Sequence, residues 1–145
     1  MTLTFVAVMV AGILPLVCAG IAKAGWKDYD NRNPRAWLTQ QTGFRARANA
    51  AQANSFEAFP FFAVGVVLAV ITKADASLIE TLSLVFVASR VAYIACYLAD
   101  KASARSLFWA VGYGAVIWLY VLAILSCKRT SLRGGDLDFE LGASI

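Results

Sequence analysis

The chain has 145 residues, of which 60% are hydrophobic and 15% are charged, and its mean hydropathy is +0.66. These values describe a small integral membrane protein and exclude an ordinary soluble domain. The sequence contains no histidine, which excludes histidine metal sites and histidine-based acid–base catalysis. The net charge of +4 comes from scattered basic residues, so we expect no nucleic-acid partner.

Four apolar segments follow one another along the chain, each about long enough to cross a membrane as a helix. Their predicted bounds are roughly residues 1–23, 47–72, 77–98 and 105–127. The first is interpreted as a retained helix, because it has no basic start and is longer than the apolar region of a secretory signal. The predicted fold is therefore all-α, an integral membrane four-helix bundle that forms a single domain over residues 1–145. Residues 128–145 are predicted to be a flexible, solvated tail, and membrane lipids are expected partners.

The connections between these segments differ in positive charge. The first and third connections carry Lys23, Lys27, Arg32, Arg35, Arg45, Arg47, Lys101 and Arg105. The opposite side carries Lys73, Lys128, Arg129 and Arg133. This excess predicts that the first and third connections are cytoplasmic and that both termini lie on the non-cytoplasmic side. In the long first connection, the pair Asn33-Pro34 is interpreted as a turn.

The three cysteines, Cys18, Cys96 and Cys127, lie within or at the ends of apolar spans at unrelated spacings. Such cysteines behave as small hydrophobic residues, and they predict neither a metal site nor a disulfide framework.

The second span carries a polar stripe in its first half. At about 100° per residue, Arg47, Asn54 and Glu57 fall in one sector of a helix. Asn49 and Gln52 add amide groups to the same end of the helix, although at the helix start such residues can simply meet headgroup water. A charge at depth in a bilayer costs roughly 2.5 kcal/mol or more, so Glu57 needs a partner.

A second polar stripe lies on the third span, where Arg90, Tyr93 and Tyr97 are spaced at i, i+3 and i+7. We predict that Glu57 and Arg90 lie within ion-pair reach, either within one subunit or across a subunit contact. One interpretation is that Arg90 simply neutralises Glu57. The other is a polar pocket for a zwitterionic or anionic ligand, in which arginines bind carboxylates and amides orient the ligand.

Residues 45–60, RARANAAQANSFEAFP, resemble the second-helix signature of the MAPEG family, the membrane-associated proteins of eicosanoid and glutathione metabolism. In outline that signature reads Arg-x-x-Arg-x-x-x-Asn-x-x-Glu, with Pro three or four residues later. Arg47, Asn54, Glu57 and Pro60 occupy matching positions, and Gln52 resembles a glutamine often found two residues before the Asn. The four spans, the long basic first connection and the Arg90 stripe extend the resemblance over the whole chain. The resemblance implies a bacterial-type member of the family in a bacterial inner membrane.

The resemblance implies a homotrimer in which glutathione, as co-substrate, is held between neighbouring subunits near the cytosolic helix ends. From one subunit the implied binding residues are Arg47, Gln52, Asn54 and Glu57. From the adjacent subunit they are Arg90, Tyr93 and Tyr97. Arg105 matches the arginine that stabilises the glutathione thiolate in catalytic members; otherwise it is an ordinary interface residue. The implied activity is a glutathione-dependent transferase or peroxidase acting on a lipophilic electrophile or hydroperoxide.

One position departs from the family signature. Ala50 stands where the second arginine belongs, which removes a bidentate contact to a glutathione carboxylate unless Arg45, Arg32 or Arg35 replaces it. A non-catalytic lipid-binding or scaffolding protein of the same fold is therefore the alternative, and enzymatic activity stays open. A multidrug exporter using Glu57 as a proton-coupled carboxylate is less favoured, because such transporters carry the essential acid in the first span.

Overall fold

The computed structural model describes residues 1–24 and 29–142, with side chains described up to Arg129, and the secondary structure of this part is helical. Its helices are α1 (Thr2–Ala22), α2 (Pro34–Thr39), α3 (Gly43–Ile71), α4 (Ala76–Leu98) and α5 (Ala102–Gly142). By length and composition, α1, α3, α4 and the Ala102–Arg129 part of α5 can each cross a membrane. The predicted all-α fold with four membrane-length helices is confirmed.

The helix ends depart from the predicted spans on the side of the first and third connections. Helix α3 begins at Gly43 and α5 at Ala102, because their polar first turns continue the helix outside the apolar segment. Helix α5 also continues to Gly142, beyond the predicted end of the span. The side chains from residue 130 onward and residues 143–145 lie outside the described part, so a flexible tail stays a prediction.

The short helix α2 lies where the sequence predicted only a turn. The side-chain oxygen of Asn33 accepts a hydrogen bond from the Ala36 backbone N–H at 3.4 Å, and Pro34 occupies the first helical position. Asn is a favoured N-cap and Pro is favoured at the first position, so the same pair that ends one segment starts a helix. The Trp37 ring of α2 meets Tyr29 edge-on with centroids 5.1 Å apart.

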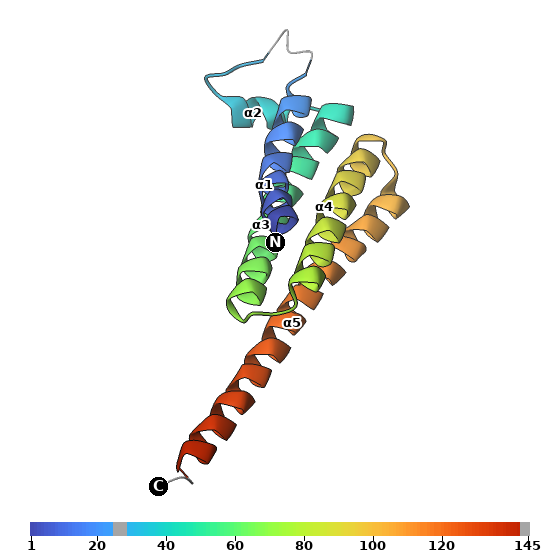
Figure 1. Cartoon of the computed structure of the whole chain (residues 1–145). Coiled ribbons are helices and arrows are strands. Elements are labelled where there is room, and N and C mark those ends of the chain that lie inside the picture. Colours follow the sequence, from blue (N-terminus) through green and yellow to red (C-terminus); the bar gives the residue numbers. More distant parts are fainter. Residues whose placement is uncertain (25–28, 143–145) are drawn as a thin grey trace.

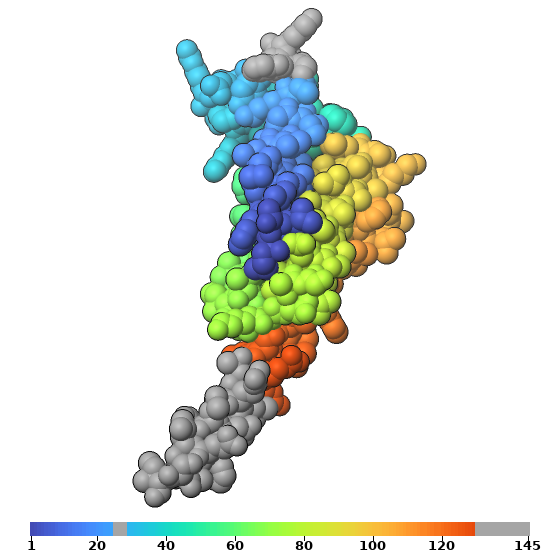
Figure 2. Space-filling model, in the orientation of Figure 1, coloured from blue at the N-terminus to red at the C-terminus, as the bar shows by residue number. Residues whose placement is uncertain are grey.

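The long helices alternate in direction, which brings the ends of α1 and α4 and the starts of α3 and α5 to the end of the bundle where α2 lies (Figure 1). We call this the α2 end. The turn between α4 and α5 lies at this end, beside the start of α3 (Figure 2). Asp100 follows the C-cap of α4 with φ 59°, a left-handed conformation that Asp tolerates better than most residues.

The core between the helices combines small residues with a few large rings. Helix α1 packs on α3 through buried alanines, including Ala11 and Ala58, which allow close approach of helices in a membrane. Phe62 of α3 stacks on Phe86 of α4 with ring centroids 4.0 Å apart. Only 28–33% of each span is buried inside the chain, so most of its apolar surface faces outward.

Candidate functional site

The polar stripes of α3 and α4 meet inside the bundle at Arg90. This side chain is 2% exposed, and its Nη2 donates to Asn54 Oδ1 at 2.9 Å and to Ser55 Oγ at 3.2 Å. Ser55, which the sequence analysis did not single out, is also buried and donates to the Ala51 carbonyl at 2.8 Å. Its position next to Asn54, in the polar first half of α3, is the signal that could have identified it.

A direct Glu57–Arg90 ion pair does not form within the chain, so this part of the sequence prediction is wrong. No salt bridge among the described residues joins the two side chains, and Glu57 is exposed. Its Oε2 accepts a 3.5 Å hydrogen bond from Asn54 Nδ2, and Asn54 therefore stands between the two charged groups. The physical reason is that Glu57 follows the buried Ser55 by two residues, about 200° of helical rotation, so it points away from the side of α3 that Ser55 turns toward Arg90. A pair across a subunit contact stays a prediction.

Two buried polar atoms at this site have no hydrogen-bond partner among the described residues. They are Nη1 of Arg90 and Oε1 of Gln52. A buried polar group without a partner costs free energy, so each such group calls for an explanation, and a role in ligand binding is one. The Arg90 atom is a donor and the Gln52 atom is an acceptor.

Arg90 begins a row of side chains that leads through two tyrosine rings to Arg105. The Arg90 guanidinium carbon lies 4.2 Å from the Tyr93 ring centroid, and the Tyr93 and Tyr97 centroids are 5.5 Å apart at 71°. The Arg105 guanidinium carbon lies 4.3 Å from the Tyr97 ring. Within the described part of the chain, Arg105 makes no hydrogen bond or salt bridge through its guanidinium. The tyrosines therefore connect two arginines from different helices.

Arg47, in contrast, is engaged by the end of α4. Its Nε and Nη2 each donate to the Leu98 carbonyl at 3.3 Å, and Nη1 lies 3.6 Å from Asp100 Oδ2. The last carbonyls of a helix lack intrahelical donors, and a basic side chain can satisfy them. The geometry gives Arg47 a role in tying α3 to the end of α4, beside any role in binding.

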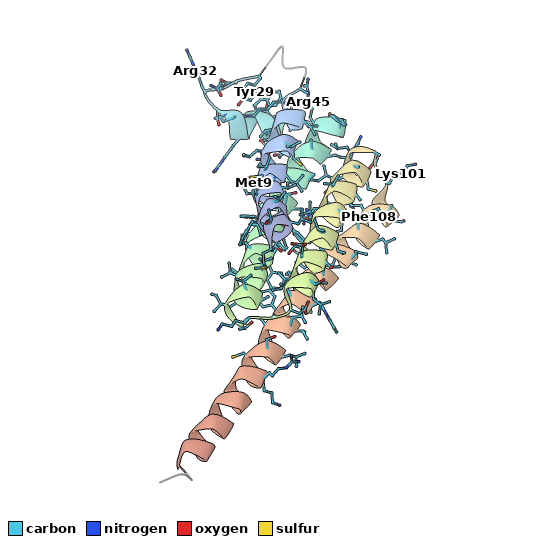
Figure 3. The ribbon with its side chains drawn as sticks, in the orientation of Figure 1. Met9, Tyr29, Arg32, Arg45, Lys101 and Phe108 are labelled. Atoms are coloured by element: carbon cyan, nitrogen blue, oxygen red, sulfur yellow. The ribbon has the colours of Figure 1, made fainter. Side chains whose placement is uncertain are left out.

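The arginines considered as replacements for the missing one at position 50 lie in or next to the first connection. Arg45 donates to the Gln41 side chain at 3.2 Å and to the Ala24 carbonyl at 3.3 Å, and its guanidinium lies 5.6 Å from the Trp37 ring. Arg32 and Arg35 are exposed. Figure 3 shows Arg45 and Arg32 at the α2 end, with Lys101 at the nearby α4–α5 turn. Arg45 is thus held by the connection.

No group of three or more Cys, Asp or Glu side chains is suitably placed for a metal ion among the described residues. Cys18 is buried, Cys96 is partly buried and Cys127 is exposed, and each is a free thiol.

Comparison with curated proteins gave no match. Comparison with known protein families matches residues 3–125 to the MAPEG family, a region that includes the polar stripes of α3 and α4 and the start of α5. The match covers most of the chain and agrees with the helical membrane fold. The chain therefore belongs to the MAPEG family.

Proposed function

We propose that this protein is a glutathione-dependent transferase or peroxidase that acts on a lipophilic electrophile or hydroperoxide. The observation that carries the proposal is the state of Arg90. Its guanidinium is buried and held by the neutral oxygens of Asn54 and Ser55, while Nη1 has no partner among the described residues. A buried cation that is oriented but not neutralised is suited to bind an anionic group.

The surrounding residues fit the rest of glutathione by chemical type. The tripeptide carries two carboxylates, one ammonium group, two amides and a thiol. Arg90 supplies a donor for a carboxylate, the exposed Glu57 carboxylate suits the ammonium group, and Gln52 Oε1 is an acceptor without a partner among the described residues. Ala50 supplies nothing, so the second carboxylate depends on another cation.

Arg105 is the proposed activator of the thiol. A thiol with an ordinary pKa near 8.5 is only a few per cent ionised at neutral pH, and an adjacent guanidinium favours the nucleophilic thiolate. Arg105 is partly buried at the start of α5 and is oriented by the Tyr97 ring. Its guanidinium has no anion partner within the described residues, so its charge is available for a thiolate.

The proposal also covers the number of subunits and the membrane in which the protein lies. We propose a homotrimer in a bacterial inner membrane, with the α2 end in the cytoplasm and both termini on the opposite side. The uneven distribution of basic residues supports this orientation. The large outward-facing apolar surface leaves room for subunit contacts as well as lipid. Light scattering of the detergent-solubilised protein, corrected for bound detergent, measures the subunit number, and a monomer would contradict the trimer.

Isothermal titration with glutathione tests the function directly, because it does not require the correct electrophile. Wild-type protein should bind glutathione, and Arg90→Gln should weaken binding at least tenfold. Arg129→Gln is the control and should not weaken binding, because Arg129 is an exposed arginine at the far end of the membrane-length part of α5. Ultraviolet thiolate absorbance should rise when glutathione is added, and S-methylglutathione should bind without this rise. Absence of both binding and thiolate signal would refute the enzymatic proposal.

The alternative is a non-catalytic lipid-binding or scaffolding protein of the same fold. It is favoured by Ala50 together with Arg47, since one expected carboxylate contact is missing and the other arginine is already engaged by Leu98 and Asp100. This alternative expects a stable, folded protein that shows no glutathione binding.

A further inference from the structure

The first connection has a defined structure at the α2 end, and α2 is its helical part. Helix α2 lies across the direction of the long helices (Figure 1). The Gln41 side-chain amide donates to the Trp37 carbonyl at 3.0 Å. Arg45 donates to the Gln41 side chain at 3.2 Å and to the Ala24 carbonyl at 3.3 Å. Arg45 therefore joins the end of α2 and the chain just after α1 to the start of α3.

Aromatic rings and basic side chains alternate along this connection. Lys23 Nζ lies 4.9 Å from the Tyr29 ring centroid, and the Tyr29 ring meets the Trp37 ring edge-on at 5.1 Å. On the other side of Trp37, the Arg45 guanidinium lies 5.6 Å from the ring. Tryptophan and tyrosine favour the headgroup level of a membrane. A helix that lies across the spans and carries these rings is therefore expected to lie along the membrane surface.

Helix α2 has an inner and an outer side. Trp37 and Leu38 are partly buried, whereas Arg35 and Thr39 are exposed. Arg32, which precedes the N-cap residue of α2, is also exposed. Figure 3 shows the Arg32 side chain directed away from the long helices. The outer side of α2 thus presents two arginines to the surroundings of the protein.

Basic residues exceed acidic residues at this end of the bundle. Outside the candidate site, the described basic residues here are Lys23, Arg32, Arg35, Arg45 and Lys101, and the acidic ones are Asp30 and Asp100. Both carboxylates have local partners, since Asp30 accepts from the Arg32 backbone N–H at 2.8 Å and Asp100 lies 3.6 Å from Arg47. Among the residues that the structure describes, no carboxylate pairs with the side chain of Arg32 or Arg35. Their charge is therefore available to an external anion.

We propose that Arg32 and Arg35 form a docking surface for anionic phospholipid headgroups of the surrounding membrane. A guanidinium binds phosphate oxygens through charge-assisted hydrogen bonds. Each basic residue close to an anionic membrane surface favours association about fivefold. A zwitterionic headgroup carries the same phosphate together with a balancing ammonium group, so its net attraction is weaker. The favoured partner is therefore a phospholipid with net negative charge, and phosphatidylglycerol is the probe.

Native mass spectrometry of the purified protein tests this lipid preference without glutathione, so the outcome does not depend on the proposed function. The protein is equilibrated in detergent with equal amounts of phosphatidylglycerol and phosphatidylcholine that have the same acyl chains, and the bound copies of each lipid are counted. Wild type should retain phosphatidylglycerol over phosphatidylcholine by about fivefold or more. The double variant Arg32→Gln/Arg35→Gln should lower this preference at least about threefold, while Arg32→Lys/Arg35→Lys, which keeps both charges, should stay within about twofold of wild type.

Lys128→Gln/Arg129→Gln is the matched control, because it also removes two exposed positive charges, at the far end of the membrane-length part of α5. Its preference should stay within about 1.5-fold of wild type. Circular dichroism checks that every variant keeps its helix content. The proposal is overturned if wild type retains the two lipids equally, or if the two Gln double variants lose the preference to the same extent. It is also overturned if the Lys double variant loses as much as the Gln variant at the same positions, because charge would then not be the cause.

Discussion

Arg90 on α4 and Asn54 on α3 are joined by a 2.9 Å hydrogen bond inside the bundle. Ser55 adds a second neutral acceptor at 3.2 Å, and no carboxylate among the described residues pairs with this arginine. The guanidinium is therefore held in place while its charge is retained. This arrangement ties two helices together and is the basis of the glutathione proposal.

Loss of Asn54 should destabilise the protein. Asn54→Ala removes the shorter of the two hydrogen bonds to a buried cation, so we expect a decrease in the free energy of unfolding of about 2 kcal/mol. Thermal unfolding in detergent measures the change. Asn49→Ala is the matched control, because Asn49 is an amide on the same helix with no hydrogen bond among the described residues, and should stay within about 0.5 kcal/mol of wild type. Similar melting temperatures for the two variants would contradict the role of Asn54.

Glu57→Gln should leave the stability of an isolated subunit nearly unchanged. Glu57 is exposed, and a Gln oxygen can accept the same hydrogen bond from Asn54. We expect a change below about 0.5 kcal/mol under conditions where light scattering shows a single copy. If the oligomer loses far more stability than the single copy, Glu57 pairs across a subunit contact. A large loss in the single copy would instead reinstate the Glu57–Arg90 pair within the chain.

Arg47→Ala should affect stability more than binding. The variant leaves the Leu98 carbonyl without its donors, and the partly exposed contact with Asp100 adds little, so we expect a loss of about 1 kcal/mol. Glutathione affinity should remain within a few fold of wild type, by calorimetry. A loss of affinity of a hundredfold with unchanged stability would show that Arg47 acts mainly on the ligand.

Arg105→Ala should separate catalysis from binding. If Arg105 stabilises the thiolate, turnover of a small electrophile such as a chloronitrobenzene should fall by about a hundredfold or more, while glutathione affinity stays within a few fold. The thiolate absorbance seen with wild type should disappear. Lys101→Ala, an exposed cation four residues earlier, is the control and should alter neither quantity. Equal turnover in the two variants would make Arg105 an interface residue.

Gly112 sets the close contact between α4 and α5. A Cβ atom at this position would lie 2.6 Å from Ser89 Oγ, which itself donates to the Phe86 carbonyl at 2.7 Å. Gly112→Ala should therefore destabilise the protein by about 1–3 kcal/mol in chemical or thermal unfolding. Ser89→Ala removes the obstructing oxygen, so the double variant should recover part of the loss. No recovery would mean that α4 and α5 pack differently.

Ala50→Arg restores the second arginine of the family signature, which this chain lacks. It should raise glutathione affinity about tenfold in calorimetry, because it returns a charge-assisted contact to a ligand carboxylate. Unchanged affinity would mean that another cation, such as Arg32 or Arg35, already supplies this contact.

The sequence by itself determined the number and type of the membrane-length helices. Long apolar segments leave a membrane chain no stable alternative to helices, because every backbone polar group needs an internal partner. It also predicted the two polar stripes, since residues such as Asn54 and Glu57 within one helix are related by its fixed period. The short helix α2 was encoded as well, by Asn33 and Pro34, although the pair was interpreted as a turn.

Only the tertiary structure decided which side chains meet. Arg90 contacts Asn54 and Ser55 rather than Glu57, Arg47 reaches the end of α4, and Phe61 enters a stack with rings of α5. These contacts depend on the rotation and axial offset of one helix against another. Close packing of many small contacts, such as Gly112 against Ser89, sets that geometry, and no local period along the chain contains it.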